Sequence, residues 1–123
     1  MLMQLFVEIE GASIDELLQF YTKDLPFFEF YGDYGMQTLK LINRRGNFGL
    51  ILKENTSHSA INKNLFFLNV DCIESIFSKL QKSSNFKGTL ITKEIFEWPG
   101  GKSISIMDPA GNKFLVTEEH LFD

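Results

Sequence analysis

The first half of the chain changes between strand-like and helix-like spacing of its apolar residues. Leu5, Val7 and Ile9 occupy every second position, which is typical of a β-strand. Residues 13–22 instead place apolar side chains at i, i+3, i+4 and i+7, behind a capping box that starts at Ser13, so they predict an amphipathic helix. Three more alternating segments predict strands at 27–31, 36–43 and 48–53, the first two separated by a turn at 32–35. The predicted order is βαβββ.

The second half of the chain repeats this order after a polar stretch. Residues 54–63 lack periodicity, and we interpret them as a linker. A second capping box at 71–74 precedes a helix whose apolar residues follow helical spacing from Ile73. The remaining predicted elements are strands at 64–70, 89–97, 102–107 and 113–117. This half is therefore also βαβββ.

The two halves superpose at a fixed shift of 59 residues. That shift maps Val7 onto Phe66 and Ile14 onto Ile73, apolar on apolar. Such matches alone are weak evidence, but here the whole order of elements repeats with them, so we infer an internal duplication. We expect one domain over residues 1–123, with module 1 at about 1–53 and module 2 at about 64–123.

Sorting the strand residues by parity separates two kinds of sheet face. One kind, which includes Leu5, Val7 and Ile9, is almost purely aliphatic and aromatic, and we expect it to pack beneath the helices. The other kind mixes polar and apolar side chains, with too many apolar ones for a solvated surface, so it predicts a ligand-binding cleft. The mixed set includes Gln4, Phe6, Glu8, Ile51, Leu65, Phe67, Asn69, Leu115 and Thr117.

Composition and charge narrow the function classes. The chain has 12 basic and 16 acidic residues, a net charge of −4, which argues against a protein that binds duplex nucleic acid and is compatible with a neutral or cationic small ligand. Cys72 is the single cysteine, so no internal disulfide can form and a cytoplasmic location is expected. No apolar run is long enough to cross a membrane, and residues 1–10 lack the basic start of a signal peptide.

Three segments carry a resemblance to a known family. Residues 13–25 resemble its first helix, which ends in Phe-Tyr; residues 65–71 resemble the start of its second module; and 98–101 with 108–112 resemble its Trp/Gly turn and its Asp-Pro-x-Gly-Asn turn. The family is the vicinal oxygen chelate superfamily, which includes glyoxalase I, bleomycin-resistance proteins, fosfomycin-resistance enzymes and extradiol dioxygenases. The resemblance implies an α+β fold: two βαβββ modules forming an open, curved mixed sheet around a cleft, with the helices on the outer face.

The chain departs from this family at the metal site. Metal-dependent members place His, Gln or Glu side chains at four strand positions, which the resemblance maps onto Phe6, Ile51, Leu65 and Leu115. None of these side chains can donate a lone pair to a divalent ion. We therefore expect no metal and no other cofactor, and the departure argues against glyoxalase, dioxygenase and thiol-transfer chemistry.

The sequence then predicts a metal-free protein that binds, and so sequesters, a drug or metabolite that is planar or aromatic and neutral to cationic. The alternative is an enzyme of the lyase or isomerase type that uses Glu8 as its acid or base, or holds a metal with other residues; a degenerate member that serves only as an oligomeric partner is a third interpretation. A homodimer is expected from the aromatic residues Phe27, Phe28, Phe30, Tyr31 and Tyr34. The candidate ligand-binding residues are Gln4, Phe6, Glu8, Ile51, Leu65, Phe67, Asn69, Phe96, Trp98, Leu115 and Thr117.

Overall fold

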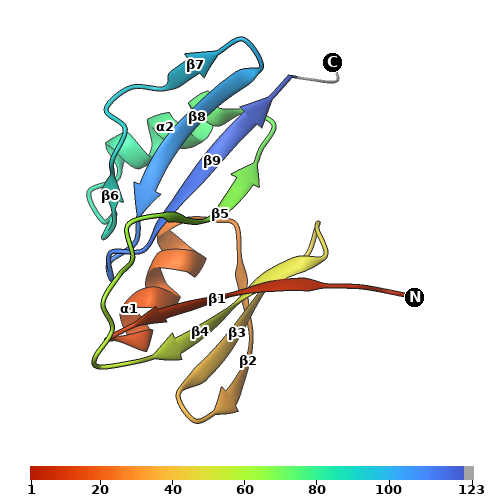
Figure 1. Ribbon diagram of the computed structural model, residues 1–123, viewed down its shortest axis with the longest axis vertical. Coiled ribbons are helices and arrows are strands. Elements are labelled where there is room, and N and C mark those ends of the chain that lie inside the picture. The colour runs from red at the N-terminus through yellow and green to blue at the C-terminus, as the bar shows by residue number, and fades with distance from the viewer. Residues whose placement is uncertain (121–123) are drawn as a thin grey trace. The chain divides into compact units, whose positions relative to one another are not determined.

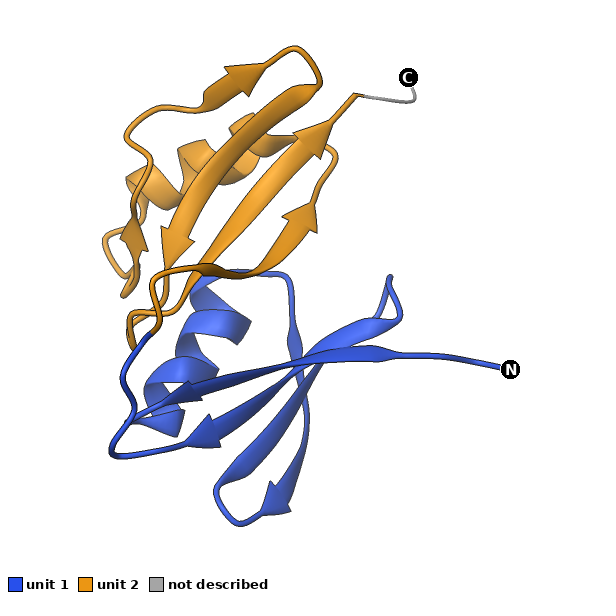
Figure 2. Cartoon of the chain, viewed as in Figure 1, with its two compact units in different colours: residues 1–60 blue, residues 61–123 orange. Residues whose placement is uncertain are grey.

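The chain divides into two compact units, Met1–Ala60 and Ile61–Asp123 (Figure 2). The structure is a computed structural model and describes residues 1–120. Each unit contains one sheet and one α-helix, so the predicted α+β class with two helix-and-sheet modules is confirmed. No helix among residues 1–120 is long and apolar enough to cross a membrane.

Unit 1 is a four-stranded mixed sheet with a helix on one face (Figure 1). The strand order is β1-β4-β3-β2, with β1 parallel to β4 and the other neighbours antiparallel. Its core lies between the helix and the sheet, where Ile9, Leu17 and Leu52 are fully buried. Leu5 is an exception to the predicted core face, because it lies at the start of an edge strand and is 69% exposed. The elements are β1 (Leu5–Gly11), α1 (Ile14–Gln19), η1 (Phe20–Asp24), β2 (Glu29–Gly35), β3 (Thr38–Asn43) and β4 (Phe48–Glu54).

The predicted helix at 13–22 is an α-helix followed by a turn of π-helix. Ser13 caps it as expected, since its hydroxyl accepts a hydrogen bond from the Glu16 N–H at 3.3 Å. The widening to π geometry appears where the Leu25 N–H donates to the Phe20 carbonyl at 2.9 Å, a step of five residues. Phe20 and the adjacent Tyr21 are both fully buried, with their rings edge to face at 4.8 Å.

The turn of the β2–β3 hairpin is not at 32–35, where the sequence predicted it. Register shifts after Phe30 and after Asp33 lengthen β2 to Gly35, and the tip is formed by Met36 and Gln37. Both tip residues have left-handed backbones, with φ of 50° and 58°. This is the backbone twist that two-residue hairpins favour, although Asn-Gly is the usual sequence for it. The bulges explain the error, because they add residues that strand alternation does not reveal.

Unit 2 is a five-stranded mixed sheet with α2 on one face (Figure 1). The strand order is β5-β9-β8-β6, and β7 also pairs with β8. The predicted strand at 89–97 is therefore two short strands, because the chain leaves the ladder between Leu90 and Phe96. The elements are β5 (Asn64–Asn69), α2 (Ile73–Lys82), β6 (Thr89–Leu90), β7 (Phe96–Trp98), β8 (Gly101–Met107) and β9 (Lys113–Glu119).

The turn between β8 and β9 is closed by a buried aspartate. Asp108 Oδ1 accepts hydrogen bonds from the backbone N–H groups of Ala110 and Asn112, each at 2.9 Å, and its Oδ2 accepts from the Asn112 side chain. Gly111 has a φ of 90°, which favours glycine there. The Asp-Pro-x-Gly-Asn sequence is thus explained by the geometry of this turn.

A shared glutamate contact supports the internal duplication. In each unit the first strand is parallel to the last, with Ile9 opposite Leu52 and Leu68 opposite Val116. Two residues after Leu52, Glu54 Oε1 accepts a hydrogen bond from the Ile14 N–H at 3.2 Å. Two residues after Val116, Glu118 Oε1 accepts from the Ile73 N–H at 2.9 Å. The last strand of each unit therefore satisfies a free N–H at the start of the helix of the same unit.

The second capping box is absent. Helix α2 begins at Ile73, its N-cap is Cys72, and the Cys72 side chain makes no capping hydrogen bond. The strand residue Glu118 supplies that bond instead. The capping box predicted at 71–74 was therefore wrong. The long-range hydrogen bond from the Ile73 N–H to Glu118 takes the place of the predicted local one.

Candidate functional site

Three predicted site residues lie on one face of the unit 1 sheet. Strand pairing places Phe6 opposite Gly49 and Glu8 opposite Ile51, and β3 continues the second row with Lys40 opposite Ile51. Residues paired directly across neighbouring strands point to the same side of a sheet. We call this surface, formed by Phe6, Glu8, Lys40 and Ile51, the mixed face of unit 1; the helix-covered core residues lie on the opposite side.

An ammonium group lies among aromatic rings on this face. Gly49 has no side chain, and a Cβ there would come within 2.8 Å of the Phe6 ring, so the ring lies across the glycine. Lys40 Nζ is 4.2 Å from the centroid of that ring, within range of cation–π attraction. Tyr31 and Tyr34, both exposed on β2, have ring centroids 5.4 Å from the same nitrogen. Three rings therefore surround one ammonium.

Glu8, the candidate acid or base of the alternative enzyme, forms an ion pair. Its Oε1 is 3.3 Å from Lys53 Nζ, and the two side chains are 51% and 45% exposed. This is the geometry of an ordinary surface salt bridge, whose contribution to stability is small. Gln4 lies just before β1 and is exposed.

The predicted residues of unit 2 also gather on one face, apart from Leu65. A register shift in β5 between Asn64 and Phe67 leaves Leu65 outside the paired ladder. The other residues follow the pairing of four strands. Their rows are Phe67–Leu115–Ser105 and Asn69–Thr117–Ser103–Phe96, with Trp98 opposite Gly101 on the next row. We call this set the mixed face of unit 2.

Two aromatic rings on the mixed face of unit 2 are stacked. Phe96 and Trp98 have ring centroids 6.2 Å apart and an interplanar angle of 27°. Phe96 is 62% exposed and Trp98 is half-buried, so the stack presents apolar ring surface to solvent. A planar molecule can extend such a stack.

The polar residues of this face bond to each other. The Thr117 hydroxyl donates to Asn69 Oδ1 at 3.2 Å, and the same oxygen accepts from the Glu119 N–H at 3.0 Å. Thr117 is buried, and its hydroxyl forms a hydrogen bond between neighbouring strands. Of the two side chains, that of Asn69 is the one exposed to solvent.

The four residues that the resemblance maps onto metal-ligand positions do not fit a metal ion. Phe6, Ile51, Leu65 and Leu115 carry only hydrocarbon side chains, and divalent ions require oxygen, nitrogen or sulfur ligands. On the mixed face of unit 1, Phe6 is used instead as the ring beneath Lys40.

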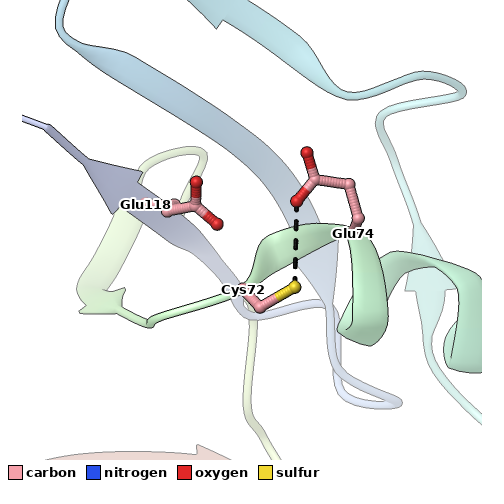
Figure 3. Close-up of side chains that lie close together, drawn as sticks. All are labelled: Cys72, Glu74 and Glu118. Carbon is pink, nitrogen blue, oxygen red and sulfur yellow. Dashed lines mark hydrogen bonds between the residues drawn. The ribbon is translucent and has the colours of Figure 1, made fainter.

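A different group of metal-ligating residue types lies at the start of α2 (Figure 3). Ligand atoms of Cys72, Glu74 and Glu118 lie within 4.8 Å of one another. Their oxygens already have protein partners: Glu118 bonds to the Ile73 N–H, and Glu74 accepts a hydrogen bond from Lys102. That bond lowers the pKa of the Glu74 carboxyl and raises the pKa of Lys102. The cluster is therefore explained by helix capping and an ion pair.

Lys40, Tyr31, Tyr34 and Gly49 were not among the sequence-predicted site residues. Lys40 is in a strand whose polar positions look like those of any half-solvated strand, and its proximity to Phe6 depends on the register of three strands. The available signal was the position of Gly49 on the mixed face, since a glycine within a strand often marks close approach by another group.

Comparison with known proteins identifies the fold. No protein-family model and no curated protein matches the sequence. Among solved structures, a member of the glyoxalase/bleomycin resistance protein/dioxygenase superfamily from Sphaerobacter thermophilus is 19% identical with a TM-score of 0.76, over 97% of this chain and 98% of that one. TnmS3, an antibiotic binding protein from Streptomyces sp. CB03234, is 14% identical with a TM-score of 0.71, over 98% of each chain.

A lactoylglutathione lyase from Agrobacterium tumefaciens is 19% identical with a TM-score of 0.73, over 96% of this chain and 94% of that one. The chain therefore has the fold of the glyoxalase/bleomycin resistance/dioxygenase superfamily, as the three resembling segments predicted. The same fold is found in an enzyme and in an antibiotic-binding protein, so function must be argued from the side chains.

Proposed function

We propose that this chain, with its glyoxalase/bleomycin resistance/dioxygenase fold, binds a small planar organic molecule without a metal and thereby sequesters a drug or metabolite. The observation that carries the proposal is that hydrocarbon side chains occupy the four positions that the resemblance maps onto metal ligands, in two units that keep exposed aromatic rings; these residues are Phe6, Ile51, Leu65 and Leu115. The structural likeness to TnmS3, described as an antibiotic binding protein, supports the same function.

The side chains favour binding over catalysis at Glu8. A general base needs to reach a substrate proton, and Glu8 instead faces Lys53 at 3.3 Å on a half-exposed surface. The single cysteine, Cys72, is free and exposed, which supports the cytoplasmic location that we propose.

The proposal is tested by titrating the chain, dialysed against a chelator, with a panel of planar aromatic compounds. Trp98 is the single tryptophan, so its fluorescence reports binding on the mixed face of unit 2. We expect saturable quenching by at least one compound, a matching rise in the melting temperature, and no change when divalent metal is restored. Binding that appears only with added metal, or a panel in which no compound raises the melting temperature, would contradict the proposal.

Replacing Trp98 with alanine should weaken binding of that compound by roughly three- to tenfold. Stacking on an aromatic ring contributes about 0.5–1.5 kcal/mol beyond area burial. Calorimetry is the measurement, because the variant lacks the fluorophore. The control is Phe30→Ala, which removes an exposed ring paired with the core residue Leu41, on the side of the unit 1 sheet opposite its mixed face. Equal affinity of Trp98→Ala and the parent chain would remove Trp98 from the site.

We also propose that the chain forms a homodimer. Of the aromatic residues on which this expectation rests, Phe28 is buried in unit 1, whereas Phe30, Tyr31 and Tyr34 are more than half exposed. Exposed aromatic surface of this kind often marks an interface. Light scattering at micromolar concentration should give about twice the chain mass of 14.2 kDa, and a value equal to the chain mass would exclude the dimer.

A further inference from the structure

We infer that the mixed face of unit 1 binds an aromatic acid, with Lys40 pairing with its anionic group and the rings of Phe6, Tyr31 and Tyr34 contacting its aromatic body. This inference rests on the proposed function and adds the chemical class of the ligand. It also differs from the neutral or cationic ligand that the sequence predicted.

The ammonium of Lys40 has no acidic partner. Among residues 1–120, no carboxylate lies within ion-pair distance of its ammonium and no protein acceptor takes its hydrogen bonds. The carboxylate across the row, Glu8, pairs with Lys53 instead. The Lys40 ammonium therefore has its N–H donors available for another partner, on a protein with a net charge of −4.

Two glycines make room for the aromatic rings near Lys40. Gly32 is directly opposite Lys40 on β2, and Gly49 is opposite Phe6 on β4. A Cβ at Gly32 would lie 3.2 Å from the Tyr34 ring, and one at Gly49 would lie 2.8 Å from the Phe6 ring. The absence of two side chains thus lets aromatic rings lie close to the ammonium.

The side chains around Lys40 favour one chemical class of ligand. Aromatic faces attract an ammonium but accept no strong hydrogen bond from it, so a carboxylate or phenolate oxygen adds an interaction that the protein lacks. A cationic ligand would have to approach a lysine that has no compensating acid, which is unfavourable in a partly desolvated site. The ring surface of Phe6 and the two tyrosines then favours an acidic group attached to an aromatic system.

The test uses three probes with the same ring system: 2-naphthoate, neutral 2-naphthamide and cationic 2-naphthylmethylammonium, measured by calorimetry on the full chain. We expect 2-naphthoate to bind tightest. Lys40→Met, which keeps the apolar stem and removes the charge, should weaken 2-naphthoate roughly tenfold or more and change 2-naphthamide less than twofold. Lys23→Met, which changes an exposed lysine of η1 outside the sheet, is the matched control and should leave 2-naphthoate within twofold, with circular dichroism confirming that both variants fold.

Tighter binding of the amide or the ammonium, or an unchanged affinity of Lys40→Met for 2-naphthoate, would overturn the inference while leaving metal-free binding intact. Failure of all three naphthalene probes would also overturn it. The proposed function itself fails only if the wider panel gives no ligand or a metal-dependent one, so the two failures are distinguishable.

Discussion

Replacing Gly49 with alanine should lower the free energy of unfolding by about 2–3 kcal/mol and abolish binding on the mixed face of unit 1. A Cβ at this position would lie 2.1 Å from the backbone carbonyl oxygen of Leu41 and 2.8 Å from the Phe6 ring. A side chain can rotate away from such a contact, but a carbonyl in a paired strand cannot, so β3 and β4 must separate locally. Urea unfolding measures the loss.

Two variants identify which contact causes the loss. Gly32→Ala changes another glycine of the same sheet whose Cβ would meet only the Tyr34 side chain, at 3.2 Å, so its free energy of unfolding should change by less than about 1 kcal/mol. Adding Phe6→Ala to Gly49→Ala removes the ring contact and leaves the Leu41 carbonyl contact, so it should not restore stability. Full recovery in that double variant would show that the ring alone was limiting.

Replacing Glu118 with alanine should cost about 2–4 kcal/mol, more than the equivalent change at Glu54. Glu118 is 7% exposed and bonds to the buried N–H of Ile73 at 2.9 Å; its other oxygen is 2.8 Å from His120 Nε2. Its loss leaves an unsatisfied N–H at the positive end of α2 and a small cavity. Glu54 accepts a longer, part-buried bond of 3.2 Å from Ile14, and we expect about 1 kcal/mol there.

Glu118→Gln separates the hydrogen bond from the charge. The amide oxygen can still accept from Ile73, so this variant should lose only about 1 kcal/mol, mainly the interaction with the helix dipole. Denaturant unfolding of the alanine and glutamine variants at both positions measures these differences. Equal losses for Glu118→Ala and Glu54→Ala would contradict the view that burial sets the cost.

The elements that the sequence predicted well are those determined by local pattern. Alternation located β4 and β9 to within two residues, and helical spacing located α2, because a buried stripe requires that periodicity. The tip at Met36 and Gln37 was missed, since neither residue is a usual turn former and two bulges shift the register before it. The division of 89–97 into two strands was missed for a similar reason: hydrogen bonding to β8, rather than composition, decides where each strand ends.

The candidate site likewise contains features that the local pattern predicted and features that depend on strand order and register. Strand parity predicted that Phe6, Glu8 and Ile51 share one face of the sheet. The observed pairing of β1 with β4 confirms this. The approach of Lys40 to Phe6 could not be predicted, because it depends on β4 lying between β1 and β3, an order that alternation does not encode. Leu65 shows the opposite case, where a register shift breaks the parity that the prediction relied on.

The pairing of β1 with β4 also bears on when unit 1 can fold during synthesis of the chain. Every strand of the unit 1 sheet lies between Leu5 and Glu54, and the N–H of Ile14 finds its carboxylate partner at Glu54. Once the ribosome has released Asn55, whose N–H donates to the Gly11 carbonyl, the nascent chain has all the strands of that sheet and this last backbone partner. Unit 1 can therefore assemble its sheet during translation, while the strands of unit 2 are still being synthesised, and its exposed strand edges have less time to aggregate.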